Sequence, residues 1–248
     1  MGINLKNEKL SFYKKKRNQI LFFLTSFLVI AVAIFFILLS SGVDSNILLG
    51  IYFVLAIVYL GVLLVFRVRF NIYNTYYQYL LMIENKRPPY QLSKKLYTEN
   101  WLKDIQNTYQ LDVDNNQYQL YSTYVKKSHT PYFVKQTLVV VVVAKDPGFD
   151  FYSDDINHEI EKFHLSKLKI RRQIVLQFKR YEHLDDVTIS EIEQIINYKE
   201  GQNQIIHVTA GYSDKENKLY FLEPQKRYPS KYYLFTCQTI KALSYISE

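Results

Sequence analysis

The chain has 248 residues, of which 48% are hydrophobic and 22% are charged, and its formal net charge is +8. That length corresponds to one or two ordinary domains. The high apolar content, 7 glycines and a single cysteine exclude a disordered chain, a collagen-like repeat and a domain held together by disulfides.

Two long uncharged apolar runs lie near the N-terminus, at residues 20–39 and 47–66. A helix of about 20 apolar residues crosses the hydrocarbon layer of a membrane. A helix of a soluble protein is rarely apolar on every face over that length. Signal peptides have shorter apolar regions, of roughly 7–15 residues. We therefore predict a transmembrane hairpin of two spans, of which the first is retained as an anchor.

The basic residues that flank the two runs predict the orientation of the hairpin. Residues 1–19 contain six basic residues and one acidic residue, residues 67–95 contain the same numbers, and the short turn contains only Asp44. Loops rich in Lys and Arg stay on the cytoplasmic side and attract anionic lipid. We expect a multi-pass protein of a bacterial cell membrane, in contact with the lipid bilayer, with both termini cytoplasmic. The flanking residues are Lys14, Lys15, Lys16, Arg17, Arg67 and Arg69.

The remaining residues, 96–248, carry a formal charge of only −1. A nucleic-acid-binding domain usually has a basic surface that neutralises phosphates. This charge balance therefore argues against a nucleic acid as partner. The lone Cys237 is consistent with a reducing cytosol, in which disulfides are rare.

The sequence divides into a basic tail at 1–19, the hairpin at 20–66, a juxtamembrane helix and linker at 67–91, and an α+β domain at 92–248. Pro88 and Pro89 cannot donate backbone hydrogen bonds, so they should end the juxtamembrane helix. Periodicity and turn residues predict one mixed sheet in the domain. The expected helices are 93–109, 153–163, 188–199 and 239–246, the expected strands are 118–125, 134–144, 170–181, 205–209, 218–222 and 232–235, and 112–116 is an expected turn. Thr188 and Glu191 have the spacing of a capping box for the third helix.

A strand with the pattern Q-x-K, at Gln177 and Lys179, precedes an expected helix and a strand that ends in a Thr/Gly-rich turn at residues 205–213. This stretch resembles the core of the Mrr-type restriction endonucleases. The resemblance covers about 40 residues and implies that Gln177 and Lys179 occupy the metal-proximal and catalytic positions, with Mg²⁺ as cofactor. The preceding valine-rich strand contains no acidic residue, and Asp146, which follows it, is the acidic residue to consider for that metal.

The residues taken alone commit to no catalytic group, metal site or cofactor. His158 and His164 are six positions apart, so a helix would direct them about 240° from one another rather than to one metal ion. Our leading hypothesis is a membrane-anchored adaptor or regulator without enzymatic activity, which binds a protein partner or forms a homo-oligomer. The alternatives are a tethered restriction-endonuclease-like domain, active or inactive, and a two-span sensor that perturbs the membrane when its domain binds a ligand.

Overall fold

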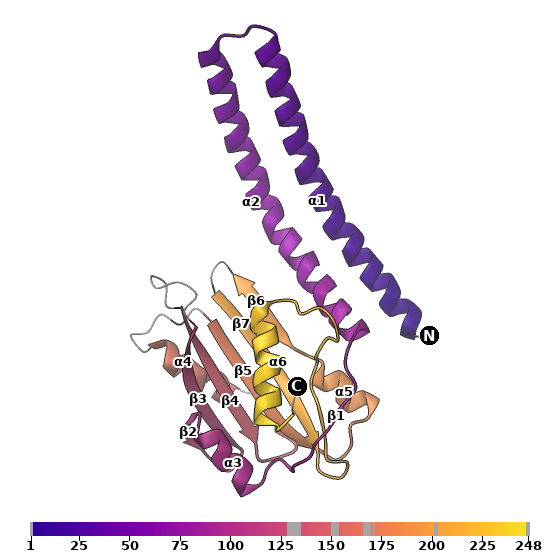
Figure 1. Cartoon of the computed structure of the whole chain (residues 1–248), viewed down its shortest axis with the longest axis vertical. Helices are drawn as coiled ribbons and strands as arrows, with labels where there is room; N and C mark the ends of the chain where they lie inside the picture. The colour runs from indigo at the N-terminus through magenta and orange to yellow at the C-terminus, as the bar shows by residue number, and fades with distance from the viewer. Residues whose placement is uncertain are drawn as a thin grey trace. The chain divides into compact units, whose positions relative to one another are not determined.

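The computed structural model describes residues 2–127, 135–149, 154–165, 170, 172–200 and 203–246. The chain divides into two units, Met1–Glu84 and Asn85–Glu248. The first unit consists of two long helices, α1 (Gly2–Ser40) and α2 (Ser45–Glu84), which run antiparallel (Figure 1). Both are long and apolar enough to cross a membrane.

Aromatic side chains hold α1 and α2 together along the apolar part of the pair. The rings of Phe27 and Tyr59 are stacked at 5.4 Å, and those of Phe35 and Tyr52 meet edge to face at 4.5 Å. Helices of 39 and 40 residues are about 60 Å long, twice the thickness of the hydrocarbon layer. The surplus lies at the N-terminal end of α1 and the C-terminal end of α2. The stretch expected to be a basic tail is therefore helical from Gly2 onward.

The second unit contains one mixed sheet, as the sequence predicted, and this sheet has eight strands. Its order is β1-β8-β7-β5-β4-β3-β2, and β6 pairs with part of β7. The three central strands β4, β5 and β7 are parallel to one another, and all other pairs are antiparallel. The strands are β1 (Tyr90–Gln91), β2 (Gln110–Asp114), β3 (Tyr118–Lys127), β4 (Lys135–Ala144), β5 (Arg172–Tyr181), β6 (Ile196–Glu200), β7 (Asn203–Ser213) and β8 (Lys218–Tyr220).

Helices cover both faces of this sheet (Figure 1). On one face, Val140 and Val142 of β4 pack in a core cluster with Ile156 and Ile160 of α4 (Asp154–Leu165). On the other face lie α3 (Glu99–Gln106) and α6 (Lys231–Leu243), and Trp101 of α3 meets the ring of Phe178 edge to face at 5.3 Å. Because both faces are covered, every side chain from Leu138 to Ala144 is buried, as its β-branched run predicts.

The expected helix over 188–199 is wrong in both its start and its length. The helix α5 (Asp186–Ile192) begins earlier and is capped by Asp185, whose Oδ1 accepts a hydrogen bond from the Thr188 amide at 2.8 Å. Residues 196–200 form β6 instead, because they pair with residues 203–207 of β7. Sheet pairing has overridden a helical pattern of isoleucines.

Three further expectations are corrected by the fold. The helix expected over 93–109 begins only at Glu99, after the side chain of Thr98 accepts a hydrogen bond from the Trp101 amide. The turn expected at 112–116 starts later, because Asp112 belongs to β2, which pairs with β3. The strand expected at 232–235 lies inside α6, which Ser230 caps through the Tyr233 amide at 3.1 Å.

Candidate functional site

The two residues of the Q-x-K pattern lie on β5 with their side chains buried on the α5 side of the sheet. Lys179 is held inside the domain: its Nζ lies 3.0 Å from Oε1 of Glu191 in α5. The hydroxyl of Tyr181 donates to the same oxygen at 2.9 Å. Burial raises the pKa of Tyr181, and its hydrogen bond to Glu191 raises that pKa further. Tyr181 is therefore a constant donor at physiological pH.

Gln177 belongs to a short row of polar groups that continues onto β7. Its Oε1 accepts a hydrogen bond from Thr209 Oγ1 at 3.1 Å, across the register pair that joins β5 to β7. Two residues earlier on β7 lies His207, whose pKa is lowered to about 4 by burial, so its imidazole is neutral at pH 7. Gln177 Nε2 and His207 Nε2 are both buried and find no hydrogen-bond partner in the described part of the chain.

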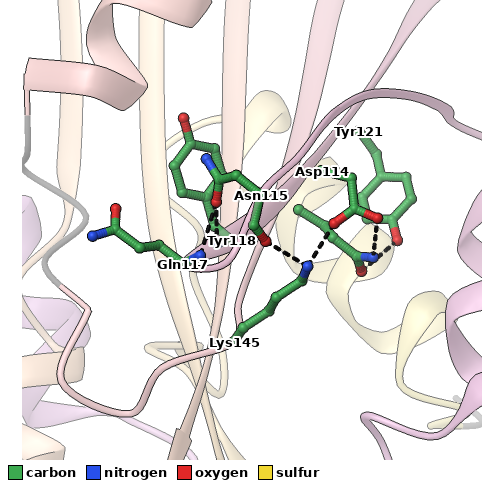
Figure 2. A network of polar contacts seen from close by, with 7 residues as sticks. Asp114, Asn115, Gln117, Tyr118, Tyr121 and Lys145 are labelled. Carbon is green, nitrogen blue, oxygen red and sulfur yellow. Dashed lines mark hydrogen bonds and ion pairs between the residues drawn. The ribbon is translucent and has the colours of Figure 1, made fainter.

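Asp146 makes contacts different from those of Gln177 and Lys179. It is exposed, and its Oδ1 accepts a hydrogen bond from the Gly148 amide at 2.9 Å, which closes the turn after β4. The neighbouring cation, Lys145, is directed to Asp114 Oδ1 and to the carbonyl of Asn115 (Figure 2). The bond from Lys145 lowers the pKa of Asp114. Among the described residues, no hydrogen bond or ion pair joins Asp146 to Gln177 or Lys179.

The histidine and carboxylate side chains do not assemble a metal site in the part of the chain that the structure describes: no three His, Cys, Asp or Glu residues gather closely enough to hold an ion. His158 lies 4.0 Å from Glu161 on the exposed side of α4. His183 lies 3.7 Å from Glu216, in the turns that follow β5 and β7. These contacts are those of solvated surface residues.

A fully buried carboxylate, Glu223, forms a second polar centre that sequence reasoning missed. Its Oε1 lies 2.8 Å from Nζ of Lys241 and accepts a hydrogen bond from the Tyr228 hydroxyl at 2.5 Å. Its Oε2 accepts a hydrogen bond from the Tyr90 hydroxyl, and Arg87 Nε lies 3.9 Å from Oε1. Burial raises the pKa values of Tyr90 and Tyr228, and their bonds to Glu223 add to this effect. The carboxylate is thereby surrounded by donors, as a buried charge requires.

Arg87 and Tyr90 belong to the linker that follows α2, and Glu193, just after α5, contacts this linker at a second point. It forms an ion pair with Lys86 and accepts a hydrogen bond from the Tyr220 hydroxyl at 2.6 Å. The backbone of the linker is fixed as well, because the Arg87 amide donates to the Glu223 carbonyl at 2.9 Å. We refer to Lys86, Arg87, Tyr90, Glu193 and Glu223 as the linker clamp. Its two acidic members are more than 100 residues from its basic and tyrosine members in the sequence, and their position among apolar residues is the only local signal that could have indicated the clamp.

A hollow of about 530 Å³ lies between α3 and α6, within the size range of small-molecule sites. Ile105, Phe235 and Leu243 are among the apolar residues that line it. Asp104 at its margin accepts a hydrogen bond from the Tyr245 hydroxyl. Burial, followed by this bond, raises the pKa of Tyr245 to about 12.

Comparison of the chain with known protein families, with curated proteins and with solved structures finds no match.

Proposed function

We propose that this chain is a membrane-anchored regulatory adaptor without enzymatic activity. The α1–α2 hairpin inserts into the cell membrane with both termini in the cytoplasm, and the α+β domain binds a protein partner there. The length and apolarity of the two helices support the insertion. The basic residues beside both apolar runs, and their near absence from the turn, support the orientation.

The linker clamp is the observation that carries the adaptor function. Residue 85 directly follows the last residue of α2, and its carbonyl already accepts a hydrogen bond from the Gln225 amide at 2.8 Å. The next residues then engage two buried carboxylates, Glu193 and Glu223. Burying a carboxylate is costly unless it is paired. The clamp gives the N-terminal segment of the domain a defined structure, which supports a domain that presents one fixed surface to a protein partner.

The contacts of the polar groups of β5 also support a domain without enzymatic activity. The ammonium of Lys179 is engaged by Glu191, and the amide oxygen of Gln177 is engaged by Thr209. In this function they are structural groups that join β5 to α5 and β7. The nitrogens of Gln177 and His207 that lack a hydrogen-bond partner among the described residues are the observation that favours the nuclease-like alternative.

The test is gentle purification of the full chain from its native membranes, followed by identification of what accompanies it. We expect a stoichiometric protein. A double variant, Lys86→Ala with Arg87→Ala, should lower the recovery of that protein several-fold, because it removes both cations of the linker clamp. The matched control, Lys95→Ala with Lys103→Ala, makes the same change of charge at exposed positions outside the clamp. Recovery of nucleic acid alone, or of the chain alone, would contradict the adaptor function.

A further inference from the structure

The hollow between α3 and α6 has a fixed shape, because two hydrogen bonds join the helices on either side of it. Both helices lie on the same face of the sheet (Figure 1). The indole Nε1 of Trp101 in α3 donates to the carbonyl of Leu243, the last residue of α6, at 2.7 Å. The hydroxyl of Tyr245 donates to Oδ2 of Asp104 in α3. The hollow is therefore formed by the fold itself, as most small-molecule sites are.

Tyr245, which lines the hollow, has a backbone conformation that favours glycine. Its φ is 57°, and it lies directly after the C-cap of α6, where glycine commonly ends a helix. A residue with a Cβ atom is disfavoured in this conformation. The tyrosine makes two contacts that glycine would lack, the bond to Asp104 and the approach of Lys94 Nζ to 4.4 Å from its ring. The chain thus keeps a large side chain at the hollow, at a position where glycine would be less strained.

One polar group at the hollow has no partner. Tyr109 lines the hollow and is only 7% exposed, and its backbone amide donates to the carbonyl of Ile105 at 2.9 Å. Its hydroxyl makes no hydrogen bond to any residue in the described part of the chain, and burial alone raises the pKa of Tyr109 to about 12. Buried tyrosine hydroxyls usually find a partner, and those of Tyr90, Tyr181 and Tyr228 each donate to a carboxylate. A molecule in the hollow can supply the acceptor that Tyr109 lacks.

The residues around the hollow define the chemistry of that molecule. Apolar side chains such as Val125 and Phe235 line it, so most of the molecule should be apolar. Among the described residues that line the hollow, only Asp104 is charged, and its carboxylate disfavours an anion. Asp104 is exposed to solvent and already accepts the bond from Tyr245, so it does not require a cation. The acceptor that fits Tyr109 is therefore a neutral carbonyl or ether oxygen.

We infer that the hollow between α3 and α6 binds a neutral, mostly apolar small molecule whose carbonyl or ether oxygen accepts a hydrogen bond from Tyr109. An aromatic ketone is the simplest molecule of this class. The site lies entirely within the α+β domain, so it depends neither on the membrane insertion nor on the protein partner of the proposed function.

Quenching of Trp101 fluorescence in the full chain in detergent tests the site. Trp101 is the sole tryptophan and is bonded to Leu243, which lines the hollow, so a bromine atom bound there should quench it. The probe is 4-bromoacetophenone, and 4-bromotoluene is the matched probe without an acceptor. We expect saturable quenching by the ketone. Tyr109→Phe should raise its dissociation constant about fivefold to tenfold and leave that of 4-bromotoluene unchanged.

A substitution that fills the hollow gives an independent measurement. Ala242→Phe places a ring at a residue that lines the hollow, and it should raise the dissociation constants of both probes at least about tenfold. The matched control is Ser190→Phe, at an exposed position of α5, which should change neither. Quenching that does not saturate, an equal loss of both probes in Tyr109→Phe, or unchanged binding in Ala242→Phe would overturn the inference.

Discussion

The ammonium of Lys241 in α6 lies 2.8 Å from the carboxylate of Glu223, and that carboxylate has no exposed surface. Lys241 itself is only 13% exposed along its side chain. The pair joins the last helix of the domain to the segment after β8, and through Tyr90 and Arg87 it also holds the linker that follows α2. The domain core and the linker therefore share one buried charge.

Replacing Glu223 should destabilise the domain strongly. In Glu223→Gln the shape is kept, but the cation of Lys241 stays buried without its counter-charge, which costs about 3–5 kcal/mol. The free energy of unfolding can be measured in urea on the full chain, through the fluorescence of the sole tryptophan, Trp101, which is buried in the domain. The control is Glu216→Gln, which removes a partly exposed pair with Lys218 and should cost less than about 1 kcal/mol. Equal losses in the two variants would argue against the role of Glu223.

His207 should make the domain less stable in acid. Its pKa is about 4 in the folded domain because of burial, whereas the ordinary value is 6.5. In the unfolded chain His207 therefore binds a proton as the pH falls below 6.5, whereas in the folded chain it stays neutral until about pH 4. The contribution of His207 to the free energy of unfolding is fully present above pH 6.5, and the free energy falls by about 2–3 kcal/mol as the pH approaches 4. His207→Leu should lose this dependence in urea titrations at several pH values, and the variant His158→Leu, at an exposed position, should keep it.

Gly211 is required where β7 passes beneath α5. A Cβ atom at this position would lie 2.2 Å from Cδ1 of Ile192 and 3.0 Å from the ring of Tyr181. We expect Gly211→Ala to cost about 1–3 kcal/mol through overpacking. Combining it with Ile192→Val, which removes Cδ1, should cost less than the sum of the two single changes. In the control Gly148→Ala, the atom nearest to the added Cβ is 3.5 Å away, so we expect little loss of stability. Additive effects of Gly211→Ala and Ile192→Val in the double variant would show that the predicted collision is absent.

Lys179 distinguishes the adaptor from the nuclease-like alternative. Since its ammonium is paired with Glu191, we expect Lys179→Ala to change stability by about 1 kcal/mol and to leave the bound protein partner in place. Neither the full chain nor this variant should cleave plasmid DNA in the presence of Mg²⁺. Cleavage by the unmodified chain that is lost in Lys179→Ala but kept in Lys199→Ala would refute the adaptor function.

Composition and periodicity predicted those elements whose environment is uniform. The two apolar runs became α1 and α2, and the valine run became β4, whose continuous apolar pattern reflects burial on both faces of the sheet. The isoleucines near 192 and 196 misled the prediction, since Ile192 is buried by a helix and Ile196 pairs in a strand. Their local spacing fits a helix, and only the partner strand β7 decides the outcome.

The linker clamp could not be predicted for a similar reason. Glu223 can be recognised as part of the clamp only from its contacts with Arg87, Tyr90 and Lys241, which are 18 to 136 positions away in sequence. The Q-x-K pattern, in contrast, can be recognised in the local sequence, but the residues that its side chains contact cannot. Glu191, expected to cap its own helix, instead reaches back to Lys179 and Tyr181.

The most direct test of the membrane-anchored account is the accessibility of single cysteines in intact cells to a maleimide that cannot cross the membrane. One variant is Asp44→Cys, in the turn between α1 and α2, and the other is Glu216→Cys, in the turn after β7. We predict labelling of the first in intact cells, and labelling of the second only after the cells are opened. Labelling of Glu216→Cys in intact cells, or protection of both positions until lysis, would contradict a hairpin that displays its domain in the cytoplasm.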